Sequence, residues 1–278
     1  MTKPDVTVII PFRNQSDLLE QACRSLREQS QSRWHALLIN DGSTLQAVRV
    51  AELLCQNDPR FKLLHVANSK HFPGPWLARN VGLHVATSPL VAFLDADDLW
   101  HPLKLEHHLS LHRYEPRLLS VCSYHRFQAA DLKVVETRFP PKKLDFAQLL
   151  RGNAIPLSAV LADRQALLTA GGFWPERHED YGLWLRLFAG PSPPAYACLK
   201  ETLMAYRLHP HSLSAARHWS VLSVNQLFRQ HLPQRRQRWP TLARWGLEHL
   251  RTALARQSQA NCQNLLPQPF LTLAQGTT

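Results

Sequence analysis

The 278-residue sequence contains only five cysteines, and no two of them form a CxxC pair. A small, odd and scattered set of thiols is typical of a reduced cytoplasmic protein rather than a disulfide-stabilised secreted one. No apolar run approaches the roughly 20 residues that a membrane-spanning helix requires. The first residues also lack the apolar core of a signal peptide. We therefore expect a cytoplasmic protein that is neither secreted nor integral to a membrane.

Several motifs of common catalytic and nucleotide-binding sites are absent. The sequence has no GxSxG, no P-loop, no GxGxxG and, despite 15 histidines, no HExxH. No cysteine stands in an arrangement typical of nucleophilic catalysis. The sequence therefore excludes the classes of catalytic and nucleotide-binding site that these motifs form.

The composition is that of a globular protein with a basic surface. Hydrophobic residues make up 45% and charged residues 19%, which excludes intrinsic disorder as the main state. The net charge is +11 with the histidines neutral. Such a surface attracts nucleic acid, anionic lipid or phosphorylated small molecules, and charge alone does not choose among them.

The N-terminal third has a regular rhythm. Apolar runs begin near residues 6, 34, 61 and 90, at intervals close to 28 residues. The segments 17–29, 43–55 and 76–86 between them have helical spacing. Continuous hydrophobic strands alternating with helices predict an α/β fold with a parallel sheet buried on both faces.

Carboxylates follow two of these predicted strands. In such sheets, ligands bind beyond the carboxyl ends of the strands. Asp95 and Asp97 in the segment DADD would point the same way, about 7 Å apart, and two such oxygen donors suit a divalent cation. Asp97 or Asp98 could alternatively cap the next helix. Asp41 in the segment NDGS could accept hydrogen bonds from a bound base or belong to a simple strand-to-helix turn.

After residue 100 the pattern changes. We expect a helix over 102–112, strands over 119–124, 132–137 and 153–161, and then a helix that Gly171 and Gly172 end. A further helix should run from Glu179 to residue 189. The adjacent acids Glu179 and Asp180 at its start could complement the helix dipole or serve as a general base.

In their order and spacing these segments resemble the family 2 glycosyltransferases of the GT-A fold. The resemblance covers roughly residues 4–214 and rests on VIIPFRN (8–14), SLREQS (25–30), NDGS (40–43), ARNVGL (78–83), FLDADD (93–98), GGF (171–173), ED (179–180) and YRLH (206–209). It implies a Rossmann-like, mostly parallel sheet flanked by helices in residues 1–215. A nucleotide-binding half would span about 4–115 and an acceptor half about 116–215, followed by a helical, basic extension over 216–278.

The resemblance also implies an inverting, metal-assisted transfer from a nucleotide diphosphate sugar, UDP-linked by family habit, to a hydroxyl of a glycan or lipid-linked acceptor. Asp180 would be the base, with Glu179 beside it. Mn²⁺ or Mg²⁺ would bind Asp97 and Asp95, with His209 as a further candidate ligand. The nucleotide sugar would be held by Pro11, Arg13, Asn14, Asp41, Arg79, Asp95 and Asp97.

The segment from Arg229 to Arg256 carries seven arginines and one acid, accompanied by tryptophans and leucines. It could be a solvated helical face with a small core, or an interfacial helix at the inner, anionic face of the cell membrane. The same charge suggests an alternative function, a protein that binds nucleic acid or anionic surfaces without transferase activity. Because the predicted acidic cluster would repel phosphate, we expect no nucleic-acid partner.

Overall fold

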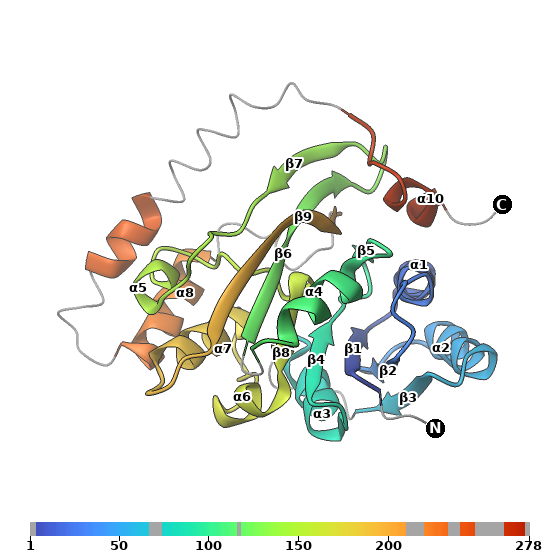
Figure 1. Ribbon diagram of the computed structural model, residues 1–278, viewed down its shortest axis with the longest axis horizontal. Helices are drawn as coiled ribbons and strands as arrows, with labels where there is room; N and C mark the ends of the chain where they lie inside the picture. The colour runs from blue at the N-terminus through green and yellow to red at the C-terminus, as the bar shows by residue number, and fades with distance from the viewer. Residues whose placement is uncertain are drawn as a thin grey trace.

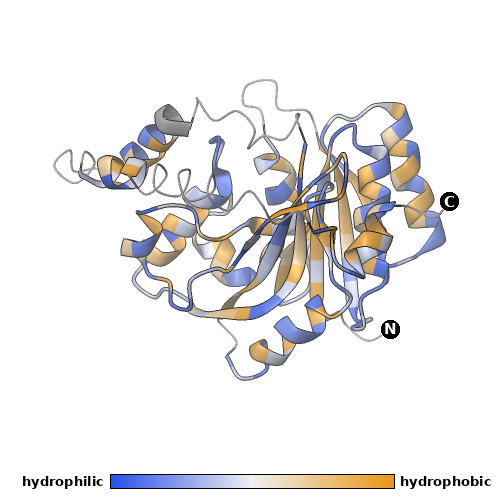
Figure 2. Cartoon of the chain, turned by 90° about the horizontal axis from the view of Figure 1, so that it is seen from above, coloured by the Kyte–Doolittle hydropathy of each residue, from blue (hydrophilic) through white to orange (hydrophobic). Residues whose placement is uncertain are grey.

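The computed structural model describes residues 4–66, 74–115, 118–209, 220–232, 240–247 and 264–275. One continuous mixed sheet runs through the molecule, and helices flank it (Figure 1). In Figure 2 the central strands carry mostly hydrophobic residues, whereas the flanking helices carry both hydrophobic and hydrophilic ones. This distribution places the core on the two faces of the sheet.

The N-terminal half confirms the predicted α/β rhythm. Its strands are β1 (Val6–Phe12), β2 (Trp34–Asn40), β3 (Phe61–His65) and β4 (Leu90–Phe93), and they pair with one another in parallel. They alternate with α1 (Ser16–Arg27), α2 (Leu45–Asn57) and α3 (Trp76–Val85). Every residue of β1 is buried, because the strand lies in the middle of the sheet with helices on both sides.

The second half continues the same sheet. The strands are β5 (Leu99–Trp100), β6 (Leu118–Gln128), β7 (Val134–Arg138), β8 (Val160–Asp163) and β9 (Ala195–Leu208), and the sheet order is β3-β2-β1-β4-β8-β6-β9-β5, with β7 beside β6. The antiparallel strand β8 joins the two halves, since it pairs with both β4 and β6. The helices are α4 (Lys104–His112), α5 (Phe146–Leu149), α6 (Arg164–Thr169) and α7 (Glu179–Ala189).

The predicted strand over 153–161 is wrong in its bounds. A short 3-10 helix, η1 (Leu157–Ala159), precedes β8, which begins only at Val160. Pro156 sets the turn into η1, and the backbone before it forms a loop. As a result Asn153 and Ser158 face a cavity instead of joining the sheet.

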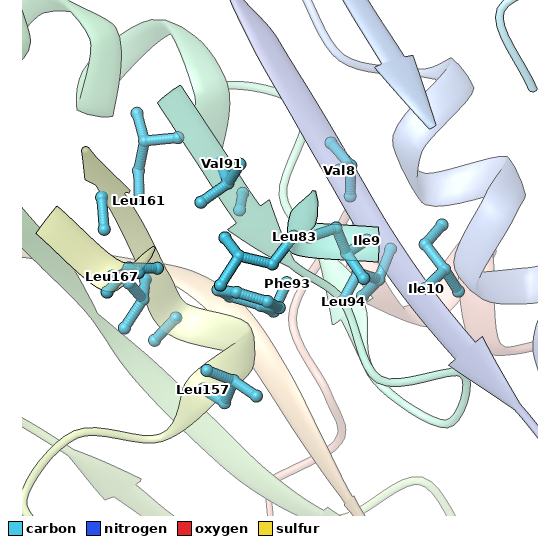
Figure 3. Packing of buried hydrophobic residues seen from close by; sticks show 14 of the residues in the cluster. Val8, Ile9, Ile10, Leu83, Val91, Phe93, Leu94, Leu157, Leu161 and Leu167 are labelled. Atoms are coloured by element: carbon cyan, nitrogen blue, oxygen red, sulfur yellow. The ribbon is translucent and has the colours of Figure 1, made fainter. Parts of the chain in front are cut away.

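Hydrophobic side chains from β1, β4, α3 and α6 pack together in the core (Figure 3). Ile9, Leu83 and Phe93 are fully buried there. Gly82 lets α3 approach β1 closely, because a Cβ at this position would lie 2.5 Å from Cγ2 of Ile9. The close approach positions the start of α3, which carries Arg79, at the carboxyl end of the sheet.

The described residues of the C-terminal extension are mostly helical, apart from 264–269, and they pack on the rest of the chain at two places. Helix α8 (Ser220–His231) and the helix over 240–247 bury Phe228 and Trp245 in the main core. Helix α10 (Phe270–Gln275) lies beside α1 (Figure 1), where Phe270 packs in a second cluster with Phe127.

These contacts bear on the predicted interfacial helix. Leu242 and Trp245, two of its apolar residues, pack against the core, whereas Trp239, Leu250 and Leu254 lie outside the described residues. No helix within the described ranges is both long and apolar enough to cross a membrane.

Candidate active site

A cavity of about 330 Å³ opens at the carboxyl ends of β1, β2 and β4. It collects side chains that are far apart in the sequence but follow neighbouring parallel strands. Its lining includes seven residues predicted for the site, namely Pro11, Arg13, Asp41, Arg79, Asp95, Asp97 and His209. The position agrees with the rule that ligands bind where the strands of such a sheet end.

Asp41 forms one end of this cavity. It is 8% exposed, and its backbone N–H donates to the carbonyl of Phe12 over 3.1 Å, which holds it against the end of β1. Burial raises the pKa of the Asp41 carboxyl, and the nearby Arg13 guanidinium lowers it in part. A largely buried carboxylate beside a cation is suited to accept hydrogen bonds from a polar ligand.

The polar residues around Asp41 form hydrogen bonds within the turn between β2 and α2. Asn40 accepts from the N–H of Ser43 over 2.8 Å, and Asn14 accepts from the N–H of Thr44 over 2.7 Å. Asn14 has a φ of +58°, which asparagine tolerates better than most residues. Asn14, although predicted to contact the nucleotide, is not among the residues that line the cavity and instead joins the loop after β1 to the start of α2.

The acidic segment after β4 forms a turn that Arg207 supports. Asp98 N–H donates to the carbonyl of Asp95 over 3.0 Å, and Arg207 Nε donates to the carbonyl of Asp97 over 2.8 Å. Asp98 is buried and accepts from the backbone N–H of Arg207. Burial, followed by the charges of Asp97 and Asp95, raises the pKa of Asp98 well above its usual value. Asp98 is therefore part of the support, whereas Asp95 and Asp97 face the cavity.

Asp97 and His209 lie together at the cavity wall. His209 Nε2 is 2.9 Å from Asp97 Oδ2, although 112 residues separate them in sequence. The His209 side chain is 13% exposed and the Asp97 side chain is 22% exposed. Within the described part of the chain no group of three or more His, Cys, Asp or Glu side chains could hold a metal ion by itself. One or two protein ligands fit a cation that takes its remaining ligands from phosphates and water.

Arg79 connects the first cavity to a second one. Its Nη2 donates to Asp95 Oδ1 and its Nη1 to Glu179 Oε1, and the side chains of Arg79 and Glu179 are only 7% and 6% exposed. Burial raises the pKa of Glu179 to about 7, and the Arg79 charge opposes this shift. Burial also raises the pKa of Asp95, with Arg79 again opposing it.

The second cavity, of about 370 Å³, shares Arg79, Asp95 and Tyr206 with the first. Asp180, at the start of α7, lines it, and Asn153 Nδ2 donates to Asp180 Oδ2 over 2.9 Å. Asp180 Oδ1 accepts from the N–H of Tyr181 over 2.7 Å. Both oxygens are thus oriented by neighbouring groups, and the carboxylate lies across Arg79 and Asp95 from the first cavity.

Several residues that line the second cavity were not predicted as site residues from the sequence. Tyr206 was part of a recognised segment, but its place between the cavities was not predicted. The others come from strand β6, strand β7, the helix η1 and the loops before η1 and α7. They are Tyr124, Arg126, Arg138, Asn153, Pro156, Leu157, Ser158, Arg177 and His178.

Comparison with known proteins now gives this site a context. The family model described as Glycosyl transferase family 2 matches residues 7–161, which is more than half of the chain. The chain belongs to glycosyl transferase family 2. Among its relatives in this family, an uncharacterized glycosyltransferase of Haemophilus influenzae is 30% identical over 77% of this chain and 79% of its own length. The family 2 chain is therefore an enzyme, a glycosyltransferase, rather than the basic binding protein considered as the alternative.

A relative with a specific name also matches this family 2 chain. The UDP-Glc:alpha-D-GlcNAc-diphosphoundecaprenol beta-1,3-glucosyltransferase WfgD of Escherichia coli is 30% identical over 78% of this chain and 85% of its own length.

Solved structures confirm the fold. S. aureus TarS 1-349, in complex with UDP-GlcNAc, superposes with a TM-score of 0.69 at 16% identity and covers 98% of this chain and 79% of its own. The mannosyltransferase PcManGT of Pyrobaculum calidifontis, in complex with GDP-Man and Mn²⁺, gives a TM-score of 0.63 at 19% identity over 99% of this chain and 85% of its own. The expected GT-A fold is thereby confirmed.

Proposed function

We propose that this glycosyltransferase moves a sugar, with inversion, from a nucleotide diphosphate sugar to a hydroxyl of a glycan or lipid-linked acceptor. The observation that carries the proposal is the meeting of two cavities at Arg79, Asp95 and Tyr206. One cavity offers the groups that suit a nucleotide diphosphate, and the other offers a carboxylate oriented by hydrogen bonds. A reaction between two substrates requires this kind of adjacency.

The first cavity is the proposed donor site. Asp41 would accept hydrogen bonds from the base, and Pro11 and Arg13 would form the neighbouring wall. Asp95 would lie near the ribose, and Arg79 would stabilise negative charge near the sugar diphosphate. A uridine donor agrees with the UDP and UDP-GlcNAc bound in the TarS structures, although the likeness to these structures supports the fold rather than the nucleotide.

A divalent cation, Mn²⁺ or Mg²⁺, would be held by Asp97 with His209 and Asp95. When bound, it would neutralise the charge that builds on the departing diphosphate. The chemistry of this donor set fits such an ion because carboxylate and imidazole groups lie together at the wall of the donor cavity. The Mn²⁺ in the PcManGT structure is consistent with the assignment.

Asp180 is the proposed base. It would accept the proton of the acceptor hydroxyl while that oxygen bonds to the anomeric carbon, and the bond from this carbon to the diphosphate oxygen breaks in the same step. Asn153 would hold the carboxylate in the required orientation. A single displacement of this kind inverts the anomeric centre without a covalent sugar–enzyme intermediate.

Glu179 has a different proposed role from its neighbour. It lies against Arg79, away from solvent, and would fix the guanidinium between the two cavities. It is therefore a positioning residue in this proposal, whereas Asp180 acts on the substrate.

Thermal unfolding with UDP, GDP, dTDP and CDP, each with and without Mn²⁺, tests the donor site. Ligand at 100 times its Kd stabilises the folded state by about 2.7 kcal/mol, which raises the Tm by several degrees. We expect a metal-dependent rise with one nucleotide and its loss in Asp97→Asn. If none of the four nucleotides shifts the Tm with Mn²⁺ present, the donor-site proposal is wrong.

A further inference from the structure

Tyr206 lies at the boundary between the two cavities. Among the residues that the structure describes, three line both of them, and these are Arg79, Asp95 and Tyr206. The first two are charged and bonded to each other, since Arg79 Nη2 donates to Asp95 Oδ1. Of the three, Tyr206 alone carries an uncharged, aromatic side chain. It has no role in the proposed metal site or in the proposed proton transfer.

The register of strand β9 determines where the Tyr206 side chain points. Successive side chains of a strand point to opposite faces of the sheet. Arg207 lies opposite Phe127 on β6, and its guanidinium carbon is 4.9 Å from the centre of the Phe127 ring. Tyr206 lies opposite Arg126, whose side chain belongs to the other face and lines the second cavity. The ring of Tyr206 therefore points toward the cavities rather than toward Phe127.

The proposed reaction requires the transferred sugar to lie at this boundary. In a single displacement the anomeric carbon stands between the departing diphosphate oxygen and the attacking hydroxyl oxygen. The diphosphate would occupy the cavity that contains Asp97, and the hydroxyl would occupy the cavity that contains Asp180. A sugar ring placed between these two groups must pass the residues that the cavities share.

We infer that the ring of Tyr206 packs against the sugar that is transferred, which makes Tyr206 a specificity-determining residue for the donor. One face of a pyranose ring exposes mainly C–H groups, and an aromatic side chain offers a matching apolar surface. Removing both surfaces from water favours binding. Sugars that differ in the groups on this face would therefore differ in affinity, and the contact with Tyr206 would contribute to the choice of sugar.

This inference rests on the proposed function, because it takes the first cavity as the site of the nucleotide. Tyr206 would contact the sugar, whereas the nucleoside diphosphate would be held by Asp41, Arg13 and the cation. The two parts of the donor would depend on different residues, so their contributions to binding can be measured separately.

Calorimetric titration measures both parts without knowledge of the acceptor. The full chain with Mn²⁺ is titrated with the nucleoside diphosphate that raises the Tm, and then with its glucose, N-acetylglucosamine, galactose and mannose esters. For each sugar, the Kd of the ester divided by the Kd of the nucleoside diphosphate reports what the sugar contributes. We expect Tyr206→Leu to raise this ratio by about 5- to 30-fold for the sugar that the wild type binds best. Tyr206→Phe, which keeps the ring, should change the ratio less than Tyr206→Leu does.

Matched variants locate the effect. Tyr114→Leu removes a tyrosine side chain that is 88% exposed, and it should leave every ratio at its wild-type value. Tyr206→Met gives a second variant should Tyr206→Leu fail to fold, because the flexible methionine side chain adapts to irregular space. It also lacks the flat face of the ring, so it should raise the ratio as well. Thermal unfolding establishes that each variant is folded before it is titrated.

Two results with folded Tyr206→Leu would overturn the inference. One is an unchanged ratio for every sugar ester that the wild type binds. The other is a nucleoside diphosphate weakened as much as its esters, because the side chain would then support the cavity and not the sugar. Wild-type protein that binds the nucleoside diphosphate but none of its esters would also contradict it.

Failure of the donor site gives a different result from failure of this inference. If none of the four nucleoside diphosphates binds to the wild type, the donor site itself is wrong, and the inference falls with it. If one of them binds and the ratio does not respond to Tyr206→Leu, the donor site stands and only the role of Tyr206 is contradicted.

Discussion

The guanidinium of Arg79 donates a hydrogen bond to the buried carboxylate of Glu179, across 100 residues of sequence. The same guanidinium reaches Asp95 at the end of β4. Removing one partner of a buried ion pair leaves an uncompensated charge and is typically costly, so this contact holds α3, α7 and β4 in a fixed relation. It thereby sets the boundary between the proposed donor and acceptor cavities.

Replacing the proposed base should separate catalysis from binding. Asp180→Asn keeps the size of the side chain and its place beside Asn153 but removes the proton acceptor. We expect transfer to fall by about 10²–10⁴-fold, with nucleotide affinity unchanged, in a steady-state assay with the preferred donor. The exposed acid Glu52 on α2 offers the control Glu52→Gln, which should transfer at the wild-type rate. Asp180→Asn activity within threefold of wild type would rule out this base.

Glu176 should make stability depend on pH. Burial raises its pKa to about 7, and Arg186 opposes the shift only in part. A carboxyl with a raised pKa in the folded state stabilises the fold below its unfolded pKa, near 4.5, and this contribution is lost as the pH rises through about 7. The unfolding free energy of wild type minus that of Glu176→Gln should therefore fall by roughly 1–3 kcal/mol between these pH values.

Urea denaturation of both proteins across this pH range measures the difference and cancels the titration of groups that they share. A difference that stays constant, or that rises with pH, would show that Glu176 does not carry a raised pKa.

Two glycines should respond to alanine in opposite ways. In Gly82→Ala the added Cβ would lie 2.5 Å from Cγ2 of Ile9, which requires core side chains to shift, at a cost of about 1–3 kcal/mol. Among the described residues, no atom lies within 4 Å of a Cβ added to Gly246, in the helix over 240–247, so Gly246→Ala should stabilise the protein by up to about 1 kcal/mol. Thermal unfolding compares the pair, and equal Tm values for the two variants would contradict the packing described for α3.

The residues that line the first cavity could be predicted from the sequence more completely than those that line the second, for a physical reason. Asp41, Asp95 and Asp97 directly follow hydrophobic strands of a parallel sheet, and the carboxyl ends of parallel strands meet at one edge. Their convergence therefore follows from local pattern. The nucleotide contact expected of Asn14 stays a prediction, and what local pattern does not show is that Asn14 Oδ1 accepts from the backbone N–H of Thr44, because this bond depends on the left-handed backbone of Asn14 and on the position of Thr44.

The arginines of the second cavity follow no such rule. Arg126 and Arg138 come together through the antiparallel pairing of β6 with β7, in which Arg126 lies opposite Glu136 and Tyr124 lies opposite Arg138. Residues near Asn153 form a loop where a strand was expected. These are long-range pairings, which local hydrophobic periodicity does not encode. Likewise the sequence allowed either a solvated helical face with a small core or an interfacial helix around Leu242 and Trp245, and the structure packs both of these residues against the main core.

In the proposed donor site, Asp97 and His209 would hold a cation at a nucleotide diphosphate beside Arg79. Anomalous X-ray scattering at the manganese edge, from crystals grown with Mn²⁺ and the preferred nucleoside diphosphate, measures this directly. We expect one strong peak within coordination distance of Asp97 and His209, with diphosphate density next to it in the same cavity as Asp41. A nucleotide bound elsewhere, or one bound in this cavity with no manganese peak at Asp97, would contradict it.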